Sequence, residues 1–349
     1  MTRDPIGNPV SEGPADALDP RPQPRAVPGI EDCAREPIHL SGAIQPHGFL
    51  ISVVLPDWTV RQASANIDEL LEVPAAELLG ESLADYINQD VLEVVADTVS
   101  FAEPDAPPQR AGVGNIGPFG VLCDLGVHVA DGLVHIEIEQ QPFHQRGNAP
   151  TGVAQAMIAR VAAAEDAGDF HQRAAEQVRL LTGYDRVMVY RFRHDDAGEV
   201  IAEARADDLE PYLGLRYPAS DIPPQARALY LRNRLRVIPD AGYVPVPVLP
   251  GVNAQGAPLD LSQHALRSVS PVHVEYLRNM GVAASMSISI ISGGRLWGLI
   301  ASRPARPSAC SASVRQSAAL SVIASTGRPR RSTHSISTVM SSDAGTRPS

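Results

Sequence analysis

Hydrophobic and polar positions in the first half of the chain predict strands followed by short helices. Alternating apolar residues at 49–55 and 59–64 predict two strands joined by a tight turn. Short helical patterns follow, through Leu70, Leu78 and residues 86–95. This order favours an α+β arrangement with one central sheet.

A hairpin is predicted further on, because residues 127–130 and 133–139 flank Asp131-Gly132, a strong two-residue turn signal. Apolar and polar residues alternate along the second strand, so one face should be buried and the other should meet water. The apolar set is Val134, Ile136 and Ile138, and the polar set is His135, Glu137 and Glu139. Strands, small helices and then a meander are typical of a PAS-like α+β domain, which we expect over residues 30–146.

The second half begins after a Gly, Asn and Pro linker at 147–150 and predicts another α+β domain. Two helical patterns come first, the second of which Gly183 can terminate. Four strands are expected, in two hairpins: 186–193, 199–204, 283–292 and 296–301. A central antiparallel sheet with helices before and within it looks like a GAF domain, here over residues 150–301.

One strand of that sheet carries serines on one face. Ser285, Ser287 and Ser289 alternate with Met286, Ile288 and Ile290, and strand side chains point to opposite faces in turn. If helices pack on the apolar face, the serine face looks onto water or onto a polar ligand.

Composition and charge limit the function classes. The 349 residues have room for about two domains, and the net charge of −11 makes the chain a poor polyanion binder. No stretch reaches the roughly 20 apolar residues of a membrane span, and no apolar signal core opens the chain, so we expect a cytoplasmic protein. The cysteines, at 33, 123 and 310, form no disulfide framework or metal cluster, and Cys123 in an apolar strand is expected to be core packing.

A stiff loop, YPASDIPP at residues 217–224, precedes a helical pattern at 225–234. Each proline fixes its own φ and removes a backbone donor, so the loop holds its free carbonyls and Asp221 still, as a ligand site requires. A helix start with Asp221 or Ser220 as its cap explains the same pattern.

Three further features stand in order with that loop: Cys33, the run IHLSGAIQPHG at 38–48 and the run LRSVSPVH at 266–273. Together, over roughly residues 30–301, they resemble a bacteriophytochrome, the red and far-red light sensor that binds biliverdin. The resemblance implies a PAS-like domain followed by a GAF domain. It also implies an N-terminal segment that threads through a GAF loop as a knot, with Ile44 in the crossing.

The resemblance assigns a role to each part of a biliverdin IXα site. Cys33 matches the thioether anchor. By itself a lone cysteine in a polar arm, after residues 1–29 that we expect to be disordered, is usually incidental. Asp221 and His273 match the residues that meet the pyrrole nitrogens, and Arg236 and Arg267 match the two propionate arginines.

The remaining matches supply walls and hydroxyls to the same site. Without the resemblance, His273 could equally lie on a helix surface and the tyrosines in an ordinary core. The matching residues are Tyr190, Tyr217, Ile222, Pro223, Tyr230, Ser270 and Tyr276, with Ser285 and Ser287 facing a propionate.

The likeness ends abruptly after residue 301. Residues 302–349 are Ser- and Arg-rich, with seven arginines and one acid, and the composition changes within one residue, as a shifted reading frame would produce. Arg303 stands where the family has the histidine that faces the ring-D carbonyl. We therefore expect an incomplete GAF domain without a covering PHY domain, hence incomplete photoconversion and a short-lived far-red state.

The leading interpretation is a photosensory PAS–GAF unit that binds biliverdin through Cys33 and senses light by bilin isomerisation, a binding function without catalysis. We find no ATP loop, phosphoacceptor box or metal-ligand spacing. Nucleic acid and membrane partners are not expected; a homodimer and an output partner, such as a missing PHY or kinase module, are possible. The alternative is a non-photosensory PAS–GAF regulatory or interaction module with an empty or defective pocket.

Overall fold

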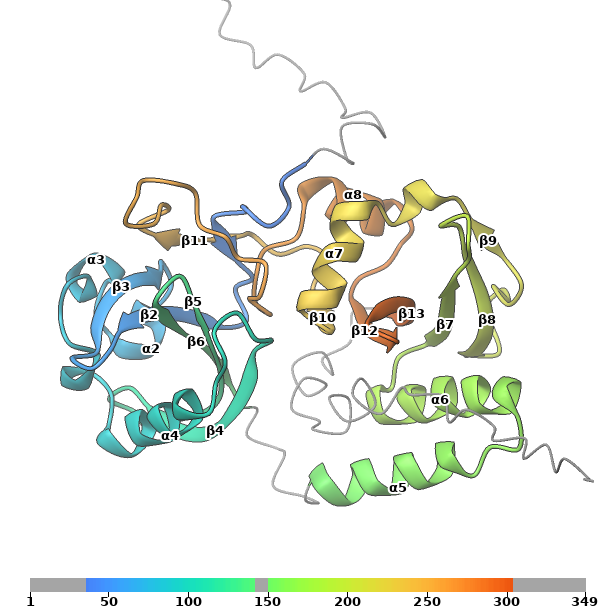
Figure 1. Ribbon diagram of the computed structural model, residues 1–349, viewed down its shortest axis with the longest axis horizontal. Helices are drawn as coiled ribbons and strands as arrows, with labels where there is room; N and C mark the ends of the chain where they lie inside the picture. The colour runs from blue at the N-terminus through green and yellow to red at the C-terminus, as the bar shows by residue number, and fades with distance from the viewer. Residues whose placement is uncertain (1–35, 142–149, 304–349) are drawn as a thin grey trace, which may run out of the picture.

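The computed structural model describes residues 36–141 and 150–303, which form two α+β lobes side by side (Figure 1). The first lobe contains strands β1 (Ala43–Ile44), β2 (Phe49–Val54), β3 (Thr59–Ser64), β4 (Gln109–Ile116), β5 (Val121–Ala130) and β6 (Leu133–Gln140). Its helices are α2 (Asp68–Leu71), α3 (Ala75–Leu78), the 3-10 turn η1 (Leu83–Asp85) and α4 (Gln89–Ser100).

The second lobe begins with two helices, α5 (Pro150–Ala162) and α6 (Ala167–Thr182). Its strands are β7 (Arg186–Phe192), β8 (Gly198–Arg205), β9 (Arg216–Tyr217), β10 (Leu235–Ile238), β12 (Ser285–Ser292) and β13 (Arg295–Arg303), while β11 (Val246–Leu249) from this half of the chain belongs to the first lobe. Between them lie the 3-10 turn η2 (Ala219–Asp221), α7 (Pro224–Arg232) and α8 (Pro271–Asn279). No helix within the described ranges is long and apolar enough to cross a bilayer.

The first sheet has the strand order β1-β11-β3-β2-β6-β5-β4, and all its pairings are antiparallel. Its core is a single apolar cluster, into which α4 inserts Val91, Leu92 and Val95, one face of an amphipathic helix. Cys123 is fully buried in this cluster, and burial raises the pKa of its thiol to about 12, so the expected packing role is confirmed. The hairpin at Asp131-Gly132 is also confirmed, with both residues at positive φ.

The second sheet has the order β10-β12-β13-β7-β8-β9. Helix α6 packs on one face, where Val178 contacts the apolar side chains of β7 and β12. Asp166 caps the start of α6 by accepting from the amide of Asp169, and Gly183 ends it in the left-handed conformation, with φ 67°. Helix α7 lies against the opposite face, so the sheet is covered on both sides.

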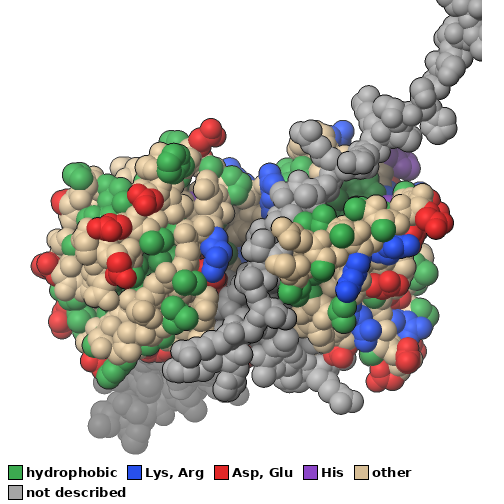
Figure 2. Space-filling model, turned by 90° about the horizontal axis from the view of Figure 1, so that it is seen from below, with side chains coloured by type: hydrophobic (Ala, Val, Ile, Leu, Met, Phe, Trp, Pro, Cys, Tyr) green, Lys and Arg blue, Asp and Glu red, His purple; other side chains and the backbone are tan. Residues whose placement is uncertain are grey.

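A strand from the second half of the chain joins the first sheet. Strand β11 pairs with β1 on one side and with β3 on the other, and Val248 lies opposite Ser64. The charged side chains differ between the two lobes on the face shown in Figure 2: acidic side chains are spread over the first lobe, whereas arginines mix with acidic side chains on the second.

The segment around β1 is enclosed by residues of the second half. Ile44 is fully buried in a cluster with Val248, Leu261 and Leu266. Backbone hydrogen bonds reach the segment from two stretches of the second half: Val248 N donates to Gly42 O, Leu261 N to His39 O and Ser268 N to Ala43 O. Ile44 therefore lies in the crossing that the resemblance implies.

One expectation about strand faces needs correction. His135 and Glu137 are buried, at 6% and 3% exposure, so these two residues on the polar face of β6 do not meet water. Residues 264–266 cover them, because the Glu137 carboxylate accepts hydrogen bonds from the amides of Ala265 and Leu266. The serine face of β12 is enclosed in part by α7: Ser289 is fully buried and donates to the carbonyl of Tyr230 in α7, whereas Ser285 is half-buried.

Candidate functional site

Most of the predicted aromatic residues gather on the α7 face of the second sheet. Tyr190 of β7 is 6% exposed and lies in one cluster with Tyr217, Ile222 and Tyr230. The ring centroids of Tyr190 and Tyr217 are 6.0 Å apart. Tyr276 joins the group from α8, because its hydroxyl donates to the Asp221 carboxylate at 3.0 Å.

The absence of a side chain at Gly198 creates the space for the Tyr190 ring. A Cβ at Gly198 would lie 1.7 Å from the ring carbon that carries the hydroxyl, far inside van der Waals contact. Glycine is therefore required here for space, at the point where β8 passes beneath the tyrosine.

The phenols of Tyr190, Tyr217 and Tyr276 are protonated at neutral pH. Burial, and then the negative charge of Asp221, raise the pKa of Tyr190 and raise that of Tyr276 to about 12. Burial also raises the pKa of Tyr217. Each hydroxyl is thus available as a hydrogen-bond donor.

The stiff loop does not serve as a helix cap. Helix α7 starts at Pro224 with Pro223 at its N-cap and no side-chain cap bond, so the alternative that Asp221 or Ser220 caps it is wrong. Asp221 ends the 3-10 turn η2 and points its carboxylate to Tyr276 instead.

Arg227, which the sequence patterns did not single out, holds that loop in place. Its Nε donates to Ile222 O at 2.7 Å, and its Nη2 donates to Ala219 O at 3.1 Å and to Asp196 O at 2.7 Å. Its guanidinium also lies 4.7 Å from the ring centroid of Phe192. A signal exists in the sequence: side chains on a helix lean toward its N-terminus, and Arg227 lies one turn after the proline pair.

The two predicted propionate arginines lie close together, and both are buried. Arg236, 9% exposed, donates to the carbonyls of Ala265, at 2.9 Å, and of Arg267. Arg267, 8% exposed, donates from Nη1 to Ile38 O at 2.6 Å, while its Nε has no hydrogen-bond partner in the described chain. Burial lowers the pKa of Arg267, but the guanidinium stays charged at neutral pH.

Ser270 connects the arm to α8. Its hydroxyl accepts from the amide of His273 at the start of α8 and donates to the carboxylate of Glu36, the first described residue. Cys33 lies outside the described residues, three positions before Glu36.

His273 faces the same group of residues from α8. Its ring centroid is 6.1 Å from that of Tyr276. Surrounding protein, and then the charges of Arg303 and Arg236, lower the pKa of His273. Part of the residue is exposed to solvent. The imidazole is neutral at pH 7, so one ring nitrogen can donate a hydrogen bond and the other can accept one.

The hydroxyl groups of β12 complete this face. Ser287 is 8% exposed, and its Oγ lies 3.4 Å from the hydroxyl of Tyr230; Ser285 is half-buried. Ser287 also lies opposite Arg236 in the β10–β12 register, so both side chains point to the α7 side of the sheet. Arg303, the last described residue, belongs to the same region, because its charge acts on Tyr217, Tyr276 and His273.

Comparisons with known proteins agree with this architecture. Residues 33–141 match the family model described as PAS fold, and residues 166–325 match the GAF domain model. The chain is 44% identical over 281 residues to a bacteriophytochrome of Pseudomonas aeruginosa, and 41% identical over 284 residues to one of Xanthomonas campestris. These matches cover 77% and 78% of this chain but only 36% and 43% of the two relatives.

Solved structures of phytochrome chromophore-binding domains share this fold. The chain matches the chromophore-binding domain of the unusual bacteriophytochrome RpBphP3 from R. palustris with a TM-score of 0.75 and 39% identity, covering 85% of this chain and 96% of that one. The chromophore-binding domain of Stigmatella aurantiaca phytochrome P1 matches with a TM-score of 0.73 and 37% identity, covering 84% and 98%. Fold and site thus define a two-domain PAS–GAF protein. The chain belongs to the bacteriophytochrome family.

Proposed function

We propose that this chain is a red and far-red photosensory unit that binds biliverdin IXα through a thioether to Cys33. One observation carries the proposal: the start of the described arm meets the candidate site. Glu36 is bonded to Ser270, whose helix also presents His273 and Tyr276 to the Asp221 loop. Three residues span at most about 11 Å, so a thiol at position 33 is within reach of that helix.

The chemistry of the residues present fits a linear tetrapyrrole with two carboxylates. Such a ligand needs cations, aromatic walls and fixed polar groups, and the α7 side of the second sheet supplies all three. The buried Nε of Arg267, which has no hydrogen-bond partner among residues 36–141 and 150–303, is the clearest sign that an acceptor belongs there. Arg236 and Arg267 would hold the propionates, with Ser270, Ser285 and Ser287 assisting.

When bound, biliverdin would supply the absorption of red light and the double bond whose isomerisation starts the signal. The protein's part is to position the pigment and to exclude water from it. The site would be lined by the aromatic rings of Tyr190, Tyr217 and Tyr230. The loop that carries Asp221 is shaped by Ile222 and Pro223. Asp221 and neutral His273 would accept and donate hydrogen bonds at the pyrrole nitrogens.

Arg303 would alter the environment of ring D of the bound biliverdin. Its guanidinium stands where the family has a histidine, and its charge acts on Tyr217, Tyr276 and His273. A permanent cation cannot exchange a proton at neutral pH as an imidazole does. We therefore expect incomplete photoconversion and a short-lived far-red state.

A non-photosensory PAS–GAF regulatory module is the second candidate. The positions of Arg236 and Arg267 favour it, because both guanidinium groups are bonded to backbone carbonyls of the chain itself. In that case these arginines hold the crossing of the two halves together, and no pigment binds.

Co-expression with a haem oxygenase separates the two candidates. The photosensory proposal predicts a purified protein that absorbs red light and a denatured gel band that fluoresces with zinc. Cys33→Ala should lose the gel fluorescence and keep some non-covalent pigment, whereas Cys310→Ala, the matched control thiol, should behave as the wild type. A colourless wild-type protein, folded by circular dichroism, would favour the regulatory module.

A further inference from the structure

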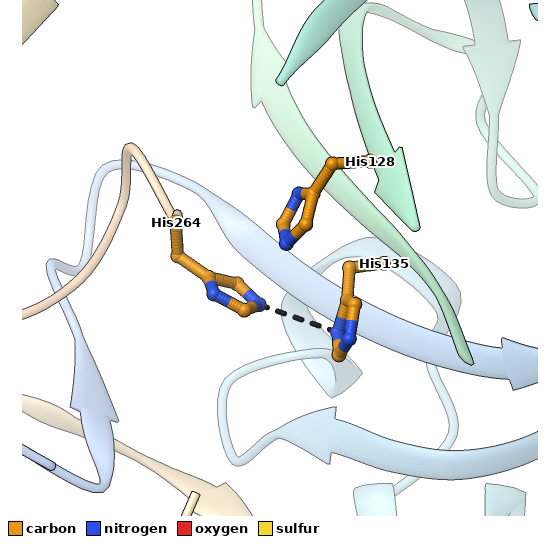
Figure 3. Close-up of side chains that lie close together, drawn as sticks. All are labelled: His128, His135 and His264. Atoms are coloured by element: carbon orange, nitrogen blue, oxygen red, sulfur yellow. Dashed lines mark hydrogen bonds between the residues drawn. The ribbon is translucent and has the colours of Figure 1, made fainter. Parts of the chain in front are cut away.

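Three histidines meet between the two halves of the chain (Figure 3), and none of them is among the candidate bilin contacts. His128 of β5 and His135 of β6 are a cross-strand pair on one face of the first sheet, with ring centroids 4.7 Å apart. His264 comes from the stretch between β11 and α8, and its ring lies 4.5 Å from His128 and 4.7 Å from His135. One nitrogen from each ring lies within 4.8 Å of the other two.

All three imidazoles are buried and neutral. They are 2%, 6% and 1% exposed in chain order. Desolvation lowers the pKa of His128 to about 3 and that of His135 to about 4, and lowers that of His264 well below 6.5. The neutral form is the one that binds metal ions.

Several of these nitrogens lack the partners that buried polar groups normally have. Both nitrogens of His128 and Nδ1 of His264 have no hydrogen-bond partner within the described residues. A neutral imidazole carries one N–H, so at least one buried donor of His128 is unsatisfied, a costly arrangement unless another group occupies the space.

His135 is held in the tautomer that a metal ligand needs. Its Nε2 lies 3.3 Å from the carbonyl of Ala130, which can only accept, so Nε2 carries the proton. The lone pair of Nδ1 then faces Nε2 of His264 at 3.3 Å and the hydroxyl of Ser52 at 2.8 Å. A backbone carbonyl that orients a ligating histidine in this way is the usual outer contact of metal sites.

We propose that His128, His135 and His264 form a binding site for a divalent transition-metal ion of the zinc class. Ligand nitrogens about 2.0–2.1 Å from a tetrahedral ion are about 3.4 Å apart, which the His135–His264 pair already matches. The 4.8 Å limit means that the remaining distances close by at most about 1.4 Å, a small side-chain rotation. A water molecule or the Ser52 hydroxyl completes the coordination.

Two charged groups near the cluster have opposite effects on cation binding. Arg267 lowers the pKa of His264 and disfavours a cation, whereas the Glu137 carboxylate lies next to the cluster, bonded to the two amides that follow His264. Glu137 and His135 point to the same side of β6, since they are two residues apart. The carboxylate therefore offsets part of the positive charge of the ion and the arginine.

A bound ion would cross-link the two halves of the chain. It would join strands β5 and β6 to the stretch that continues into Arg267 and Ser270. The role is structural, and it does not depend on pigment binding.

The test uses untagged full-length protein expressed without haem oxygenase, so that no pigment competes for metal. Cells grow with added Zn²⁺ or Co²⁺, because a buried site fills most readily during folding, and bound metal is measured by mass spectrometry after gel filtration. We expect about one ion per chain in the wild type and visible absorption of tetrahedral Co²⁺. His264→Gln should lower metal content at least tenfold, whereas His194→Gln, an exposed control histidine, should leave it unchanged.

Two results would overturn the proposal. One is a wild-type protein that contains neither metal, which would leave buried water as the occupant of the cluster. The other is a folded His264→Gln or His128→Gln variant that still binds as much metal as the wild type, which would locate the ion elsewhere. Circular dichroism of each variant shows whether a loss of metal reflects unfolding.

Discussion

Mild acid should destabilise the metal-free protein through the three buried histidines. His128, His135 and His264 are neutral in the folded protein, because burial lowers each pKa below the ordinary value of 6.5. In the unfolded chain the same histidines gain protons below about pH 6.5. The unfolded state then binds more protons, so stability falls as the pH decreases from about 6.5 toward about 4, where folded His135 begins to titrate.

The size of the effect follows from proton linkage. Between about pH 7 and about pH 5.5 each buried histidine removes about 1 kcal/mol from the free energy of unfolding, and three remove roughly 3–4 kcal/mol. That is a large part of the stability of an ordinary domain, about 5–15 kcal/mol. The carboxylates with lowered pKa, Asp57, Asp169 and Glu199, lose their contribution only below the usual carboxyl range. His171 and His273, whose pKa values are also lowered, titrate in the same window and add to the loss.

Urea unfolding with a chelator present measures the effect, followed by the fluorescence of Trp58 in the first lobe and Trp297 in the second. His128→Leu removes one titrating group and two nitrogens that have no hydrogen-bond partner in the described part of the chain, so it should reduce the loss between the two pH values by about 1 kcal/mol. The exposed control His194→Gln should leave the loss unchanged. The reasoning is refuted if the wild type is equally stable at both pH values, or if His128→Leu loses as much as the wild type.

Three further substitutions test the candidate site. Gly198→Ala forces the Tyr190 ring to move and should lower the free energy of unfolding by about 1–3 kcal/mol. In the control Gly126→Ala the new Cβ meets nothing closer than 3.8 Å, so the loss should be less than about 1 kcal/mol, and equal urea midpoints for the two variants would contradict this. Arg227→Gln removes the donors that hold the stiff loop and should lower the free energy of unfolding by about 2 kcal/mol, whereas exposed Arg232→Gln should lower it by less than about 0.5 kcal/mol. A loop in Arg227→Gln that is as well protected in hydrogen exchange as in the wild type would count against this role. Arg303→His should lengthen the lifetime of the far-red state in the pigment-bound protein, as followed by dark reversion of absorbance, and an unchanged lifetime would remove Arg303 from the explanation.

Local patterns predicted much of the second lobe. The ends of β7 and β12 lie within two residues of their predicted positions, and α6 ends directly before Gly183, because alternation and helix-terminating signals act over short distances. Strands β1, β4, β9, β10 and β11 were not predicted. All of these but β4 have two to four residues, and β1 and β11 form only where distant parts of the chain meet.

The error on β6 has a definite physical cause. Alternation shows which face is polar but not whether water or protein covers it, and here protein groups bind the polar face. For the same reason the histidine cluster was not predicted, since His264 lies far along the chain from His128 and His135. Among the site residues, three of the four tyrosines lie in one cluster and Arg236 lies against Arg267, while their roles as pigment contacts and the position of Cys33 stay predictions.

The strand that the second half lends to the first sheet has a consequence for biosynthesis. Strand β3 cannot gain its neighbour β11 until Val248 has been made, long after Ser64 has left the ribosome. At about 5–20 residues per second the wait is on the order of ten seconds or more, during which β3 is an open edge able to pair with another nascent chain. Separate expression of the two halves would make that exposure permanent, so we expect aggregation of the first half unless the second is supplied with it.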